Sequence, residues 1–348
     1  MNTRKILETF DTWRSAGEPM ALATVFETLG STYTKAGHRI VISRDGRCSG
    51  LISGGCLEAD LAEHAAGVLR AGEAKPLTYD LRDEVDDVFG LGVGCNGLIR
   101  VFIQPLLPER DYQPFAALRR FYESGHTGRC ATVIEAPAGG LAAGTTLLWG
   151  GKERLEVAGN NGDEAQLADS LSSLAAQSGE RLVSIDGHRI LLTDVEPIPR
   201  ILILGAGLDA VPLVRMCAEL GWYVDIVDHR PAYLERGDFG QADSVRLVDP
   251  RSADDMHGSK PGWDAAVVMS HHLETDAAYL QTMAPQNLRY LGVLGPPARR
   301  EKLLERLETE NPGLRRRLRG PVGLDIGGSG PSVIALSIVA ELQSVFSA

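Results

Sequence analysis

Residues 200–228 read RILILGAGLDAVPLVRMCAELGWYVDIVD, and they determine the fold of the C-terminal half of the chain. An apolar strand runs into a glycine turn, a helix follows, and a second strand ends in Asp228. The turn has the G-x-G-x-x-A pattern of dinucleotide-binding folds, in which Gly205 makes the turn, Gly207 allows a phosphate to approach and Ala210 packs the helix. Asp228 stands where such folds hydrogen-bond a ribose. The stretch predicts a Rossmann-like domain with a nucleotide-like ligand at Gly205, Gly207 and Asp228.

Strands and helices continue to alternate beyond Asp228, and this alternation predicts a doubly wound parallel sheet. The expected strands are 245–248, 265–269 and 289–294, and the expected helices are 274–283, 299–308 and 332–345. His271 follows a strand, at the carboxyl edge where open α/β sheets bind ligands. We expect it to face a ligand, as a general base or a pterin contact, with a structural cap as the alternative. His229-Arg230 leave open a preference for a 2′-phosphate.

The N-terminal half has the pattern of an α+β domain built from hairpins. We expect helices over 5–15, 111–122 and 163–178, and strands over 21–27, 38–43, 48–52, 76–81, 98–103, 131–135, 145–149, 154–157, 181–185 and 188–193. Asp45-Gly46 is a tight-turn dipeptide between two of these strands. Pro197 and Pro199 stiffen a short linker, so we expect domains at 1–195 and 196–348.

A cysteine framed by glycines is the main candidate for chemistry in this half. Gly54-Gly55 precede Cys56, and apolar residues at helical spacing follow it. Cys56 is therefore expected at the mouth of a helix, where outward-pointing amides favour the thiolate. Taken alone, the alternative of a small buried hydrophobic residue is about as common among free cysteines.

A second thiol occupies a similar sequence, Gly92-Val-Gly94-Cys95-Asn-Gly97. Neither glycine-framed cysteine belongs to a C-x-x-C pair, which disfavours zinc. We expect Cys56 to be the principal cofactor contact and Cys95 the secondary one. Three further cysteines, Cys48, Cys130 and Cys217, are expected to be inert packing residues.

Composition narrows the class of protein. The 348 residues carry a net charge of −11, which argues against general binding of nucleic acids or anionic membranes. The N-terminus is polar and no apolar run reaches membrane-spanning length, so we expect a soluble cytoplasmic protein. The acidic run 83–87 matches no calcium loop and is expected to be a solvated loop.

The chain resembles the XdhC/CoxI family of xanthine dehydrogenase maturation factors over essentially its whole length. The motifs that carry this resemblance are Gly30-Ser31, Gly37, Asp45-Gly46, Gly54-Gly55-Cys56-Leu57-Glu58, Gly90 to Cys95, Leu204 to Gly207, Val227 to Pro231, Ser270-His271 with Asp276, Tyr290 to Gly295 and Gly323 to Gly327. Two departures stand out. Ser53 replaces the first of three family glycines, and Ser270-His271-His272 replaces Thr-His-Asp, which removes an acid.

The resemblance implies a cofactor chaperone rather than a classical enzyme. Such a protein would bind molybdenum cofactor, support the exchange of an oxo ligand for sulfido by a cysteine desulfurase, and deliver the product to a xanthine dehydrogenase or aldehyde oxidase type molybdoenzyme. The implied contacts are Gly54, Gly55, Cys56 and Glu58, with Gly94 and Cys95, and Cys56 would be the ligand of molybdenum.

Two other classes of function remain open. One is an NAD(P)-dependent oxidoreductase that uses the Rossmann-like domain, and the other is a regulatory module that senses a nucleotide and binds a partner enzyme. Two domains joined by a short stiff linker also suggest a shared cleft and a homodimer. Molybdopterin in purified protein would support the chaperone, and turnover of NAD(P)H would support the oxidoreductase.

Overall fold

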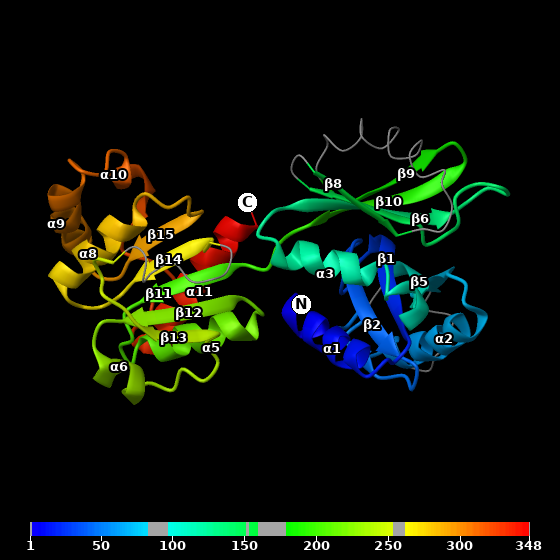
Figure 1. Ribbon diagram of the computed structural model, residues 1–348, viewed down its shortest axis with the longest axis horizontal. Coiled ribbons are helices and arrows are strands. Elements are labelled where there is room, and N and C mark those ends of the chain that lie inside the picture. Colours follow the sequence, from blue (N-terminus) through cyan, green and yellow to red (C-terminus); the bar gives the residue numbers. More distant parts are fainter. Residues whose placement is uncertain (1, 83–96, 151–152, 159–178, 253–261, 348) are drawn as a thin grey trace. The chain divides into compact units, whose positions relative to one another are not determined.

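The computed structural model describes residues 2–82, 97–150, 153–158, 179–252 and 262–347, with the backbone alone over 153–158. The chain divides into two compact units, Met1–Pro197 and Ile198–Ala348. Figure 1 shows the elements of each unit in sequence colours. Within the described ranges, no helix combines the length and the apolar character that a membrane crossing needs.

The first unit contains two antiparallel sheets of five strands each. The strands of one sheet run in the order β3-β2-β1-β5-β4. They are β1 (Met20–Gly30), β2 (Arg39–Ser43), β3 (Cys48–Ser49), β4 (Lys75–Asp80) and β5 (Gly97–Leu106). The long pairing of β1 with β5 forms the centre of this sheet, with a bulge between Val25 and Glu27.

Two helices pack with this sheet. Helix α1 (Thr3–Ser15) begins where the side chain of Asn2 accepts a hydrogen bond from the Lys5 amide, and it buries an apolar face that includes Phe10. Helix α2 (Glu58–Ala71) ends at Gly72, which has a left-handed φ of 71°. Its apolar face joins the core of the sheet. The helices therefore form where the sequence places apolar residues at helical spacing.

The second sheet of this unit has the strand order β8-β7-β6-β10-β9. Its strands are β6 (Gly128–Glu135), β7 (Thr146–Gly150), β8 (Glu153–Ala158), β9 (Arg181–Ile185) and β10 (His188–Val195). A short 3-10 turn, η2 (Pro108–Arg110), and helix α3 (Phe115–Glu123) connect the two sheets along the chain. One small apolar cluster combines residues of both sheets: Phe26, Phe102, Ile134 and Leu191.

The second unit is built on six parallel strands in the order β13-β12-β11-β14-β15-β16. They are β11 (Arg200–Leu204), β12 (Tyr223–Asp228), β13 (Ser244–Leu247), β14 (Ala265–Val268), β15 (Tyr290–Val293) and β16 (Leu318–Arg319). Numbered within the unit, this is the order 3-2-1-4-5-6 of a Rossmann fold. Its topological switch point lies between β11 and β14, where ligands of such folds bind.

Helices cover both faces of the parallel sheet (Figure 1). They are α5 (Ala210–Glu219), α6 (Pro231–Arg236), α8 (Leu273–Met283), α9 (Pro297–Leu307), α10 (Leu314–Arg317) and α11 (Pro331–Phe346). One core lies under α5 and α11, and a second lies under α8 and α9. Because strand residues alternate between these cores, β11 is apolar on both faces, as expected of a buried parallel strand.

The predicted fold class is confirmed: an α+β region with hairpins is followed by a Rossmann-like parallel sheet. Two local expectations differ from the structure. The strand expected over 48–52 ends at Ser49, because Gly50 turns out of the sheet with a φ of 103°. The helix expected to open at Cys56 begins at Glu58. The helix expected over 163–178 and the acidic run 83–87 lie outside the described residues.

Candidate functional site

A glycine turn connects β3 to α2 and carries Cys56. Gly54 and Gly55 have left-handed φ angles of 78° and 118°, which glycine adopts at little cost. A side chain at Gly54 would touch the ring of Tyr33, whereas one at Gly55 would meet no described residue within 4 Å. The Gly55 backbone is therefore open to the approach of a ligand.

The carboxylate of Glu58 holds this turn together. One oxygen accepts hydrogen bonds from the amides of Ile52, at 2.8 Å, and Ser53, at 3.0 Å. The other oxygen accepts from the Ser53 hydroxyl, which itself accepts from the Leu57 amide. Burial would raise the pKa of the Glu58 carboxyl, but the hydrogen bonds from Ser53 and Ile52 outweigh burial and lower it. The Glu58 side chain thus positions the turn around Cys56 through hydrogen bonds to the backbone of Ile52 and Ser53.

Cys56 is half-buried and lies two residues before the first residue of α2. The helix starts two residues later than the sequence suggests: its N-cap residue is Leu57, whose amide donates to the Ser53 hydroxyl. Cys48 is also half-buried, and its sulfur lies 3.9 Å from the carbonyl oxygen of Glu58. Burial, followed by the charge of Glu58, raises the pKa of the Cys48 thiol. The thiols of Cys48 and Cys56 therefore both lie near the glycine turn that precedes α2. The role of Cys56 as a cofactor contact stays a prediction.

The remaining cysteines fall elsewhere. Gly94 and Cys95 lie outside the described residues. Cys130 and Cys217 are buried in the first and second units, respectively, and burial raises the pKa of the Cys217 thiol. Within the described ranges, no group of three or more histidines, cysteines and carboxylates is arranged to hold a metal ion.

The glycine turn of the second unit meets the end of β14. A side chain at Gly205 would lie 2.6 Å from the carbonyl carbon and oxygen of Met269, and Gly205 has a φ of 123°. A side chain at Gly207 would lie 2.3 Å from a carboxylate oxygen of Asp209. Gly205 is therefore required by the close packing of two strand ends, independently of any ligand.

Asp228 is fully buried, and its carboxylate is saturated with hydrogen bonds. One oxygen accepts from the Ala206 amide at 2.7 Å and from the Arg230 guanidinium at 2.8 Å. The other accepts from the amide and the Nε of Arg230, both at 2.9 Å. The Arg230 guanidinium also stacks on the ring of Tyr233. A ribose could reach Asp228 only by displacing Arg230.

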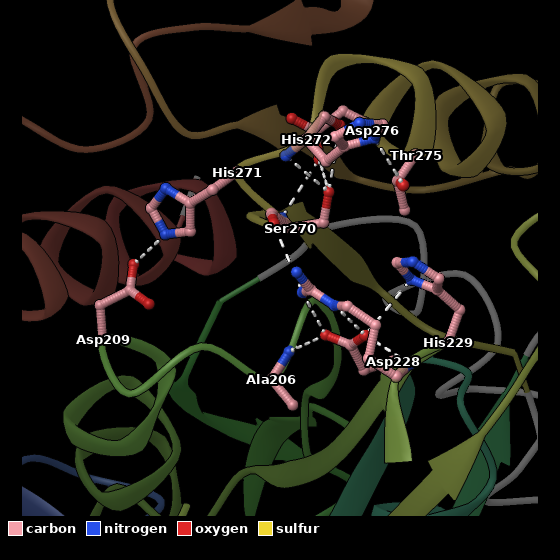
Figure 2. A network of polar contacts seen from close by, with 10 residues as sticks. Ala206, Asp209, Asp228, His229, Ser270, His271, His272, Thr275 and Asp276 are labelled. Carbon is pink, nitrogen blue, oxygen red and sulfur yellow. Dashed lines mark hydrogen bonds and ion pairs between the residues drawn. The ribbon is translucent and has the colours of Figure 1, made fainter. Parts of the chain in front are cut away.

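His271 projects from the loop after β14 toward the loop after β11, as Figure 2 shows. Its Nε2 lies 2.7 Å from a carboxylate oxygen of Asp209, and 59% of its side chain is exposed. The residue has a left-handed φ of 63°, a conformation that costs a non-glycine residue of order 1 kcal/mol. The His271–Asp209 contact therefore links the two loops that flank the topological switch point.

A buried network fixes the loop that presents His271. The Asp276 carboxylate accepts from the amide and hydroxyl of Ser270 (Figure 2). Its other oxygen accepts from the Arg299 guanidinium through Nε at 3.0 Å and Nη2 at 2.5 Å. Asp276 is fully buried, so this ion pair ties α8 to α9 inside the protein. The network positions the loop and leaves the exposed His271 ring available to meet a ligand.

Three residues with notable contacts in the structure have no functional role in the sequence-based predictions: Ser53, Asp209 and Arg39. Ser53 stands out in the sequence only as a replacement for a glycine, yet it bonds both Glu58 and the start of α2. Asp209 acquires a role only through its contact with His271. Arg39 is the first residue of β2, it precedes three apolar residues, and it is buried. The sequence feature that could have indicated its role is an arginine at the start of an apolar strand.

The family comparisons agree with the motifs. Residues 13–80 match the sequence model described as the XdhC and CoxI family. Residues 201–342 match the one described as the XdhC Rossmann domain. The first match includes the turn with Gly54, Gly55, Cys56 and Glu58, and the second includes Gly205, Gly207, Asp228 and His271.

Individual relatives cover nearly the whole chain. A protein of Bacillus subtilis, described as a probable subunit of xanthine dehydrogenase, is 32% identical over 332 residues, which are 93% of this chain and 92% of the relative. The molybdenum cofactor insertion chaperone PaoD from Escherichia coli is 25% identical over 338 residues, covering 95% and 84%. A crystal structure described as a xanthine dehydrogenase from Bacillus halodurans is 28% identical, covers 99% of this chain and 96% of its own, and has a TM-score of 0.78.

Proposed function

The chain belongs to the XdhC and CoxI family, and from this premise we propose that it is a molybdenum cofactor insertion chaperone for a xanthine dehydrogenase or aldehyde oxidase type enzyme. One observation carries the proposal. The stretch that matches the family model contains a thiol on a turn whose Gly55 backbone is open. The PaoD relative, a molybdenum cofactor insertion chaperone, aligns with both units of the chain.

The residues of the turn suit the binding and release of a cargo. A cysteine binds metals as the thiolate, so Cys56 would be the soft donor to the molybdenum of the cofactor. Gly54 and Gly55 would allow a bulky cofactor close to the backbone. Glu58, with its carboxylate committed to Ile52 and Ser53, would keep the turn in one conformation. We further propose that a cysteine desulfurase supplies the sulfur for sulfuration of the bound cargo before delivery.

The Rossmann unit has a separate role in this proposal. A nucleotide-like ligand at Gly205 and Gly207, beside His271, stays a prediction, and NAD(P) is one candidate. A ligand at a hundredfold excess over its dissociation constant should stabilise the protein by about 2.7 kcal/mol. Thermal shift with NAD, NADP and ATP measures this. Turnover of NAD(P)H would instead support the oxidoreductase alternative.

The decisive test replaces Cys56 with serine in protein made by a molybdenum-competent host. We expect Cys56→Ser to fold normally and to lose bound molybdenum and pterin, measured by elemental and pterin analysis. Cys217→Ala is the control, because that thiol is buried in the other unit and should not affect retention. Equal cofactor loading of wild type and Cys56→Ser, at matched melting temperatures, would show that the thiol is a bystander.

The partners can be tested separately. Co-purification with a molybdoenzyme and with a cysteine desulfurase examines the two proposed protein contacts. The homodimer is tested by light scattering, and monomer alone at micromolar concentration would contradict it.

A further inference from the structure

A buried arginine in the first unit has fewer partners than its charge requires. Arg39, on β2, is 6% exposed. Its guanidinium donates to the Thr193 hydroxyl at 2.7 Å and, more weakly, to the Tyr122 hydroxyl at 3.4 Å. A guanidinium carries five N–H donors. Among the described residues, no carboxylate forms an ion pair with it, and burying a charge unpaired is costly.

The guanidinium lies at the wall of a cavity of about 240 Å³. Lys35, Tyr122 and Glu180 also line this cavity. Among the described residues of the lining, Glu180 alone carries a carboxylate, and burial raises the pKa of that carboxyl although the charge of Arg39 opposes the rise. Two cationic side chains, Arg39 and Lys35, therefore line the cavity together with one carboxyl group whose ionisation is disfavoured. This excess of positive charge suits an anionic ligand.

A larger cavity of about 780 Å³ adjoins the first, because both are lined by Ile6, Lys35 and His38. Its wall includes Cys48, Gly50 and Leu51, and the last two residues lead into the Cys56 turn. No carboxylate lines it among the described residues, and Lys5 adds a second lysine to its wall. Four of its lining residues carry hydroxyl groups: Thr9, Tyr33, Thr34 and Ser49. Together the two cavities have the size of a small-molecule site.

We infer that these adjoining cavities bind an organic phosphate, with Arg39 and Lys35 holding the phosphate and the larger cavity holding the organic body. Arginine recognises phosphate through two parallel N–H donors, and lysine adds a point charge. The identification of the guest with the molybdenum cofactor rests on the proposed function, whereas the anion site rests on the buried guanidinium and the cavity.

The test compares phosphate binding by wild type, Arg39→Met and Lys35→Gln, using calorimetric titration with inorganic phosphate at low ionic strength. We expect Arg39→Met to weaken binding at least tenfold and Lys35→Gln to weaken it less. Arg110→Met removes an exposed cation of the same unit and should leave affinity unchanged. Lys35 is exposed, so its variant tests the site even if the Arg39 variant folds poorly.

Melting temperature separates the anion site from a purely structural arginine. Without phosphate, Arg39→Met should melt no lower than wild type, because an apolar side chain replaces a buried guanidinium that forms no ion pair with a described carboxylate. If the melting temperature of Arg39→Met falls by many degrees and Lys35→Gln binds phosphate as wild type does, the role of Arg39 is structural, through its hydrogen bond from β2 to Thr193. Failure of wild type to bind phosphate would also overturn the inference.

Cofactor retention distinguishes this inference from the proposed function. Equal molybdenum and pterin in wild type and Arg39→Met would overturn the identification of the guest with the cofactor and leave the proposed function intact. Loss of retention in Arg39→Met, together with loss of phosphate affinity, supports both. Arginine-dependent phosphate binding in a wild type that retains no cofactor would support the anion site and count against the proposed function.

Discussion

Replacing Glu58 with glutamine should destabilise the first unit by an amount that the hydrogen bonds predict. The carboxylate accepts three bonds, from the amides of Ile52 and Ser53 and from the Ser53 hydroxyl. Bonds to a charged acceptor contribute about 1.5–3 kcal/mol each, and neutral ones about 0.5–1.5 kcal/mol. Glutamine keeps one acceptor oxygen and turns an NH₂ toward Ser53. We expect a loss of about 1–3 kcal/mol in the free energy of unfolding at neutral pH.

The effect should depend on pH in a definite direction. The folded-state pKa of Glu58 is lowered, so its contribution is fully present above the unfolded pKa and is lost as pH falls through the folded one. The difference in the free energy of unfolding between wild type and Glu58→Gln should therefore become smaller as the pH falls. Urea unfolding, followed by tryptophan fluorescence and circular dichroism at pH 7 and at about pH 4, measures it.

The control is Glu63→Gln, an exposed position on the same helix that loses the same charge. It should change the free energy of unfolding by less than about 0.5 kcal/mol. The reasoning is refuted if Glu58→Gln is as stable as wild type at neutral pH. It is also refuted if the gap stays constant as the pH falls, because the carboxylate charge would then play no part.

Two further predictions concern the second unit. Asp276→Asn removes the buried charge that pairs with Arg299 and should lower the free energy of unfolding in urea by about 3–5 kcal/mol. Glu274→Gln, the control, breaks an exposed pair between α8 and α9 and should lower it by less than about 1 kcal/mol. Similar losses in the two variants would contradict the role of the buried network. Gly205→Ala should prevent normal folding of this unit, since its side chain would lie 2.6 Å from the backbone at the end of β14. Gly67→Ala, inside helix α2 with open space, should instead raise stability by about 0.5–1 kcal/mol; normal melting of Gly205→Ala would refute the packing argument.

Sequence patterns are most informative where periodicity and turn chemistry act locally. The pattern over 200–228 predicts a strand, a glycine turn, a helix and a second strand, and the parallel order of β11 and β12 follows from the handedness of such units. The sequence patterns do not predict the short elements α6, α10 and β16, because each is too short to show a clear period. Local patterns thus predict the layers of the fold better than its edges.

The contacts of the candidate sites could not be predicted in the same way. Glu58 follows Ser53 by five positions, and only the reversal of the chain at Gly54 and Gly55 brings their side chains together. Arg39 meets Thr193, which is 154 positions away. Which charges are buried and which are paired depends on such tertiary contacts, and no local pattern encodes them.

The saturated Asp228 bears on what the Rossmann unit can bind. In a dinucleotide-binding fold this carboxylate accepts from a ribose, yet here its acceptor positions are filled by Ala206 and Arg230. The amides of Gly207 and Leu208 have no hydrogen-bond acceptor among the described residues, and they lie beside the His271–Asp209 contact. A ligand at this edge would therefore be held by loop amides and His271, which suits a phosphate or another oxyanion better than the ribose of NAD(P).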